Sequence, residues 1–164
     1  MAIWNRIKRL SIKQFFILFW VFVKRPQYIY ATHKATIQSI QISKKYFPKK
    51  HHKHGRENAF RHALWNVLIA KNCYKPNRNP QDVVDWAEKV TTLHEKLAPN
   101  KPLETAMDLH NNHTGRQIFL NEKLYEKSIE EINAVLLESM QYSVKVENVE
   151  KIADYPDRMV HIES

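Results

Sequence analysis

Residues 57–71 read ENAFRHALWNVLIAK, and this stretch decides the fold that we expect for the chain. It contains no Gly or Pro and is rich in Ala and Leu, which predicts a helix. Residues three and four apart share a helix face, so the polar side chains of the stretch form one stripe. The rest of the circumference is almost wholly apolar, which is typical of a buried helix. The stripe would be buried with it and consists of Asn58, Arg61, His62, Trp65 and Asn66.

A second helix is predicted over residues 81–97, where apolar side chains recur at helical spacing. His94 lies in the middle of this apolar face, and Glu95 lies beside it. A buried stripe on the first helix requires polar partners from elsewhere, because buried polar groups are costly unless they are paired. We therefore expect the face that carries His94 to meet it.

A third predicted helix, residues 103–120, carries a polar stripe of its own. Asp108, Asn111 and Asn112 share a face with Gly115 by the same spacing rule. Asn is a poor helix former, and Gly inside a helix costs about 1 kcal/mol relative to Ala. Gly115 therefore predicts the close approach of another backbone or of a bound group.

Length and composition favour a single all-α domain of five or six helices. A chain of 164 residues is the size of one ordinary domain. Its two glycines argue against glycine-rich phosphate loops and against many-turned β folds. The single cysteine, Cys73, leaves no internal disulfide and suits a reducing compartment, so we expect a cytoplasmic protein.

The remaining segments predict packing helices. Pro26 can open a helix that Pro48 ends, and we expect its apolar side, which includes Ile29, His33, Ile37 and Ile40, to face the core. Residues 128–131 resemble a capping box that starts another amphipathic helix. Residues 144–149 alternate weakly and suggest a short strand without an evident partner, followed by an irregular tail.

The front of the chain is strongly basic. Residues 1–56 contain 13 Lys and Arg and no Asp or Glu, whereas residues 57–164 contain 13 Lys and Arg against 17 Asp and Glu. Residues 1–25 also carry the apolar run 15–23. This run is too short to span a bilayer, because a transmembrane helix needs roughly 20 apolar residues. We therefore divide the chain into this segment and a helical domain over residues 26–164.

Several functions fit the basic, aromatic segment 1–25. A helix lying on an anionic membrane, at its inner face, explains the flanking basic residues and Trp4 and Trp20. A core helix with a basic rim fits nearly as well. A signal peptide is disfavoured because Lys24 and Arg25 follow at once without a small-residue cleavage site. A nucleic-acid arm remains an alternative, although apolar residues add nothing to phosphate binding.

The converging stripes suggest a metal-assisted hydrolase. In this interpretation His62, His94 and Asp108 hold a divalent metal such as Zn, which acidifies a bound water, and Glu95 is the general base. The zinc-protease motif beginning at His94 is excluded, because position 98 is Ala. A metal-free mechanism, in which Asp108 orients His62 or His94 as a general base, fits the same residues equally well.

The substrate is expected to carry phosphate, and to be lipid-linked if the front of the chain binds membrane. Arg61 would clamp its anionic group. The other residues expected to orient the substrate or the metal ligands are Asn58, Asn66, Asn111, Asn112 and Arg116. Two alternatives have no catalytic site: a membrane-peripheral binding protein whose polar network is structural, and a nucleic-acid-binding protein that uses residues 1–56.

A family resemblance lies on the same residues. The pattern NAFRHALWN at 58–66, His94-Glu95, and MDLHNNHTGR at 107–116 resembles an uncharacterised bacterial helical domain family of unknown function. The resemblance covers roughly residues 57–117. It implies that these residues belong together, and it implies no particular reaction.

Overall fold

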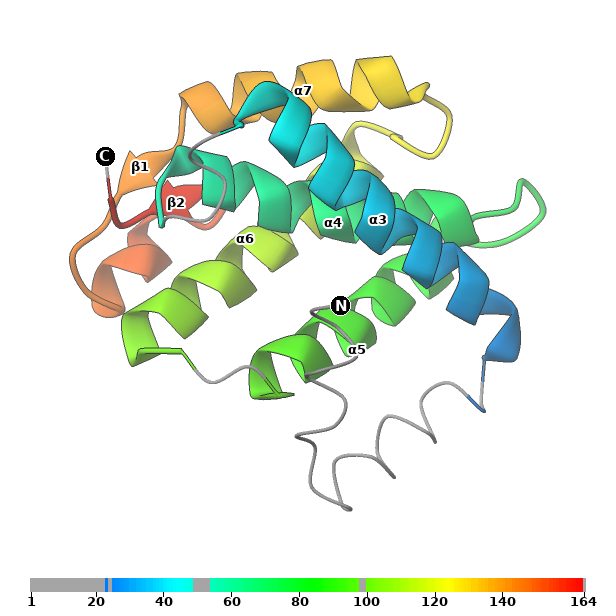
Figure 1. The fold of residues 1–164 in the computed structure, drawn as a ribbon, viewed down its shortest axis with the longest axis horizontal. Coiled ribbons are helices and arrows are strands. Elements are labelled where there is room, and N and C mark those ends of the chain that lie inside the picture. The colour runs from blue at the N-terminus through cyan, green and yellow to red at the C-terminus, as the bar shows by residue number, and fades with distance from the viewer. Residues whose placement is uncertain (1–22, 24, 49–53, 98–99, 164) are drawn as a thin grey trace.

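The computed structural model describes residues 23, 25–48, 54–97 and 100–163, and it confirms a single all-α domain (Figure 1). Within these residues two short strands and two short 3-10 helices accompany five α-helices. The elements are η1 (Pro26–Tyr28), α3 (Ile29–Tyr46), α4 (Arg56–Cys73), α5 (Pro80–Leu97), α6 (Pro102–Asn121), α7 (Ile129–Gln141), β1 (Val144–Lys145), η2 (Glu150–Asp154) and β2 (Val160–His161).

Helix α4 is the central element, as its sequence predicted. It contacts α3, α5, α6 and α7, and Phe60, Leu64 and Leu68 are fully buried among them. It lies very close to α6 at Gly115, where an added Cβ atom would lie 2.5 Å from the Ala63 carbonyl oxygen. Gly115 therefore permits a close backbone approach, as predicted.

The predicted apolar side of α3 was wrong. Its buried residues are Thr32, Ala35, Ser39 and Ser43, which are small and let the helix pack closely against α4. Two tryptophans from other helices favour this face, because they donate hydrogen bonds to α3: Trp86 Nε1 to Thr32 Oγ1 at 2.9 Å, and Trp65 Nε1 to Thr36 Oγ1 at 3.0 Å. The expected core residues Ile29, Ile37 and Ile40 are 44%, 41% and 40% exposed, and His33 is exposed as well.

The C-terminal segment supplies the strand partner that the sequence did not reveal. Strand β2 pairs with β1 in parallel, with Val160 opposite Val144. Asn111 on α6 holds β2 through two hydrogen bonds to the Val160 backbone, at 2.8 and 2.9 Å. Beyond β2, the amides of Ile162 and Glu163 donate to the carbonyl oxygen of His54. The tail is thus attached both to α6 and to the residues just before α4.

The remaining boundaries agree with the sequence. Ser128 and Glu131 form the predicted capping box at the start of α7. Among the described residues, no helix is both long and apolar enough to cross a membrane. The segment 1–25 predicted to lie on a membrane falls almost wholly outside the described residues.

Candidate functional site

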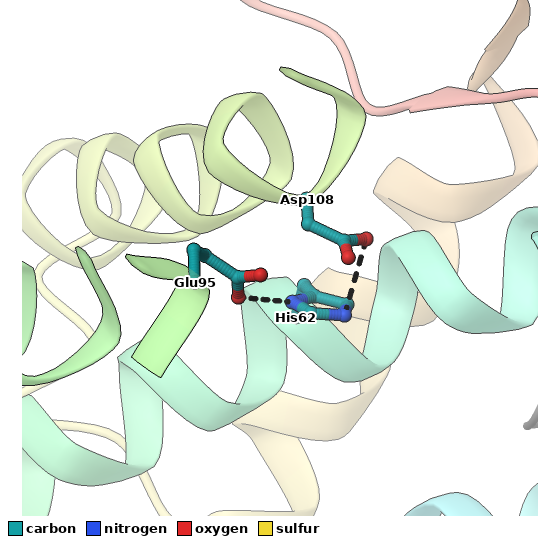
Figure 2. A group of neighbouring side chains, drawn as sticks. All are labelled: His62, Glu95 and Asp108. Carbon is teal, nitrogen blue, oxygen red and sulfur yellow. Dashed lines mark ion pairs between the residues drawn. The ribbon is translucent and has the colours of Figure 1, made fainter. Parts of the chain in front are cut away.

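Three acid–base side chains from three different helices converge in the interior (Figure 2). His62 lies on α4, Glu95 near the end of α5, and Asp108 on α6. His62 Nε2 is 3.2 Å from Asp108 Oδ1, and His62 Nδ1 is 3.7 Å from Glu95 Oε1. One ligand atom from each residue lies within 4.8 Å of those from the other two, and all three residues are buried. This spacing is compatible with a single bound cation.

Glu95, rather than His94, completes this group. The inward face of α5 carries the buried residues Ala87, Thr91 and Glu95, which are spaced four apart. His94 is half-buried and packs edge-on against the Trp65 ring, with 5.0 Å between ring centroids. The sequence therefore predicted the correct turn of α5. Within that turn, however, Glu95 and not His94 belongs to the three-residue group.

An amide network lies behind His62. His62 Nδ1 is 3.3 Å from Asn112 Oδ1, and Asn66 Nδ2 donates to the same oxygen at 2.7 Å. Asn112 Nδ2 donates to Glu95 Oε1 at 3.4 Å. Arg116 Nη1 donates to Asn66 Oδ1 at 3.0 Å, and its other terminal nitrogen pairs with Glu88. Asn66, Asn112 and Arg116 are thus occupied in orienting one another and the group in front of them.

Asn58 and Arg61 lie on the other side of the His62 ring. Asn58 Nδ2 donates to Asp108 Oδ1 at 3.0 Å, and Arg61 Nη2 donates to Asn58 Oδ1. The same Arg61 nitrogen is 3.4 Å from His62 Nε2. Arg61 is only partly buried, whereas Asn58 and His62 are buried.

Two contributors were missed by sequence reasoning, and a second predicted residue besides His94 lies elsewhere. Asn100 Nδ2 is 3.4 Å from Asp108 Oδ2. His54 lies 3.6 Å from Glu104 and acts electrostatically on both His62 and Asp108. Both residues lie outside the helices, where periodicity gives no orientation. Asn111, by contrast, is committed to β2.

The site favours a neutral imidazole beside carboxylates. Burial lowers the pKa of His62 to about 3, and the charges of Arg61 and His94 act in the same direction. Burial raises the pKa of Asp108 to about 6, against the hydrogen bond from Asn58 and the charge of Arg61. Near pH 7 His62 therefore has an unprotonated ring nitrogen, while Asp108 is largely ionised. A neutral nitrogen donor among carboxylates is the form in which these groups bind metals.

Comparison with known proteins gives a family but no activity. A family model described as a domain of unknown function, DUF6973, matches residues 19–144. Neither the curated proteins nor the solved structures contain a match to the chain. The match confirms the expected membership of an uncharacterised family and extends it well beyond residues 57–117.

Proposed function

The chain belongs to the DUF6973 family, a domain of unknown function, and we propose from its site that it is a metal-dependent hydrolase acting on phosphate-bearing substrates. The observation that carries this proposal is the convergence of His62, Glu95 and Asp108 from three helices on one buried point. A group that served only to hold the helices together would not need two carboxylates so close to each other, because like charges repel strongly in a desolvated environment.

A divalent cation resolves the electrostatics of this group. One imidazole and two carboxylates are ligands that Zn²⁺ and Mn²⁺ accept, with water completing the coordination shell. In the proposed site Glu95 takes the ligand position that the sequence had suggested for His94. The bound ion would lower the pKa of its water toward 7 and so supply the nucleophile for hydrolysis.

The phosphate part of the proposal rests on Arg61 and His54. Arg61 is next to His62 and is partly exposed, and a guanidinium is a donor that phosphate groups bind. The Nδ1 atom of His54 is buried without a hydrogen-bond partner. Both residues lie near enough to Asp108 to act on it electrostatically, and an anionic group of the substrate would approach the metal there.

Metal binding tests the first half of the proposal. Calorimetric titration of the chelator-treated full chain with Zn²⁺ and with Mn²⁺ should show one site for at least one of the two ions. Glu95→Gln should weaken binding by more than about 100-fold, because it removes a ligand rather than an outer support. Glu138→Gln, an exposed change on α7, should leave it unchanged. The absence of binding, or equal binding by Glu95→Gln, would remove the ion from the proposal.

Hydrolysis tests the second half. The metal-loaded chain should cleave a chromogenic phosphomonoester or phosphodiester, and His62→Gln should abolish the activity. Arg61→Gln should raise KM by about 10- to 100-fold, as expected for the loss of a hydrogen bond to a charged group. His33→Gln, on the exposed side of α3, is the matched control. A metal-loaded chain that cleaves neither ester would contradict the phosphate assignment.

A second candidate function, association with the inner face of a membrane, is favoured by the outer side of α3. Ile29, Ile37 and Ile40 are exposed there at helical spacing, and Lys34 and Lys44 are exposed on the same helix. Apolar residues rimmed by Lys suit the interface of an anionic bilayer. Residues 1–56 contain no acidic residues, so this part of the chain as a whole carries positive charge that an anionic bilayer would attract. A hydrolase placed there would encounter lipid-linked phosphates.

Vesicle sedimentation tests this association. The full chain should pellet with vesicles containing phosphatidylserine and not with pure phosphatidylcholine. Ile37→Asp combined with Ile40→Asp should lower the partition coefficient by at least about tenfold, since it removes two insertable side chains and adds repulsive charge. Tyr142→Asp, at an exposed aromatic residue outside α3, is the control. Equal pelleting of the double variant and the wild type would contradict the role of α3.

A further inference from the structure

We infer that Arg25 and Arg78 form a phosphate-binding pair that anchors the start of α3 to the lipid headgroups of an anionic bilayer. The inference rests on the second candidate function, association with a membrane, and it names the groups on both sides of the contact. On the protein these are two guanidiniums held against the Tyr28 ring. On the membrane they are the phosphate groups of the lipids.

One buried ring brings the two arginines together from different parts of the sequence. The Cζ atoms of Arg25 and Arg78 each lie 5.9 Å from the centre of the Tyr28 ring, which is a cation–π distance. Arg78 Nη1 also donates a hydrogen bond to the Tyr28 hydroxyl at 3.0 Å. Arg25 precedes η1, whereas Arg78 lies between α4 and α5. The start of α3 and this connection therefore lie at the same end of the molecule (Figure 1).

The Tyr28 ring is a fixed support for the pair. It is buried and packs against the Trp86 ring, with 5.4 Å between the ring centroids. Trp86 is itself held by the hydrogen bond that its indole nitrogen donates to Thr32. Side chains that are already held in place lose less conformational freedom when a ligand binds, so the support favours binding by the two guanidiniums.

The positive charge of the pair is not neutralised within the part of the chain that the structure describes. No described carboxylate forms an ion pair with either guanidinium. Arg25 is exposed and Arg78 is partly exposed, so an anion can approach both. A guanidinium has several N–H donors, of which Tyr28 takes one from Arg78, and its planar group suits the oxygens of a phosphate. The pair therefore offers unneutralised charge and unused donors to a phosphate group.

Neighbouring apolar side chains favour a bilayer over a free phosphate or a nucleic acid. Ile29 and Tyr30 directly follow Tyr28 in the sequence and are 44% and 77% exposed. Tyrosine is enriched where a membrane meets water, because its ring is apolar and its hydroxyl is polar. Residues 1–56 contain no acidic side chain that would repel anionic lipids. A lipid headgroup is thus the phosphate source whose surroundings match those of the pair.

Vesicle sedimentation with a charge-matched control tests the pair. Arg25→Gln combined with Arg78→Gln should lower the partitioning of the full chain into phosphatidylglycerol vesicles by about 25-fold, because each basic residue at an anionic surface contributes roughly fivefold. Lys151→Gln combined with Arg158→Gln removes the same charge from exposed positions near the C-terminus. This control should change partitioning by less than about threefold, since charges away from the contact are screened.

The outcomes separate the pair from membrane association in general. Equal partitioning of the two double variants would overturn the inference and leave the association itself standing. A wild-type chain that does not bind the vesicles would overturn the association as well. Arg25→Gln alone decides if the double variant does not fold, because Arg25 is exposed and its replacement leaves the core intact. Its partitioning should fall about fivefold, and an unchanged value would overturn the pair.

Side-chain NMR distinguishes a lipid from other phosphates. The ¹H–¹⁵N signal of Arg78 Nε, assigned with Arg78→Lys, should shift on addition of bilayer discs that contain phosphatidylglycerol. Half-saturation should need a phosphate concentration at least about tenfold lower than with inorganic phosphate, because the bilayer also contacts Ile29 and Tyr30. Half-saturation by inorganic phosphate or by single-stranded DNA at an equal or lower phosphate concentration would overturn the bilayer as the partner.

Discussion

Gly115→Ala is expected to destabilise the fold by about 2 kcal/mol, although alanine is the better helix former. The intrinsic gain in helix propensity is about 1 kcal/mol. An added Cβ atom, however, would lie 2.5 Å from the Ala63 carbonyl oxygen and 2.6 Å from the Ala63 Cα atom. Backbone atoms inside a central helix cannot rotate away, so α4 and α6 must separate, and overpacking of this kind costs 1–3 kcal/mol or more.

The effect can be measured by thermal and denaturant unfolding. For a chain of this size each kcal/mol lowers the melting temperature by roughly 2–4 °C. Gln117→Ala, two residues further along α6 and exposed, is the control for propensity alone and should have a neutral or slightly stabilising effect. An unchanged melting temperature in Gly115→Ala would contradict the close approach of the two helices.

The same approach sets the dimensions of the site. Gly115 lies one turn from Asn112 and two turns from Asp108 on α6, while Ala63 is adjacent to His62 on α4. Any separation of the helices at Gly115 would therefore move the carboxylate and the imidazole apart. We therefore expect the folded fraction of Gly115→Ala to bind metal more weakly than the wild type does.

Asp108→Asn is expected to stabilise the metal-free protein at alkaline pH, by on the order of 2 kcal/mol. Burial raises the pKa of Asp108 from 3.8 to about 6, so the folded state holds its proton more tightly than the unfolded chain does. Below pH 3.8 both states are protonated and this group adds no cost. As the pH rises to 6 the unfolded chain loses its proton first, so stability falls, and above pH 6 the full cost is present.

Urea unfolding with chelator, at pH 8 and near pH 4, distinguishes a functional site from a structural network. The advantage of Asp108→Asn should be largest at pH 8 and fall to a small fraction of that near pH 4, and the variant should lose metal binding. Residues kept for function at the expense of stability behave in this way. If the network were purely structural, Asp108→Asn would instead lose about 1–3 kcal/mol at pH 8 through broken hydrogen bonds.

The sequence predicted the elements well and their orientation less well. Helices α4, α5 and α6 follow from periodicity and proline positions, and the mutual approach of their polar faces follows from the cost of burying unpaired groups. The face of α3 did not follow, because small residues that pack closely have weaker hydrophobicity than the isoleucines on the outside. The hydrophobic pattern alone predicts that the face with large apolar side chains is buried, whereas close helix packing requires small side chains.

Neighbouring residues on α5 and α6 show the same limit. His94 and Glu95 are consecutive, so their side chains point about 100° apart around the helix. The apolar pattern predicted that His94 faces inward, whereas the structure places Glu95 there. The buried Thr91, which the pattern ignored because it is polar, shares the face of Glu95. Asn111 and Asn112 divide in the same way between β2 and the site. Asn100 and His54 required tertiary structure, because they lie outside the helices.

The hydrogen bonds from Ile162 and Glu163 to His54 bear on which residues a complete domain must include. The family match ends at residue 144, yet Ile162 and Glu163 bind the backbone just before α4, two turns ahead of His62. The stretch that identifies the domain is thus shorter than the stretch that contacts the start of α4. A fragment trimmed to the family boundary would keep all three metal-ligand candidates and lose the two backbone hydrogen bonds that hold His54.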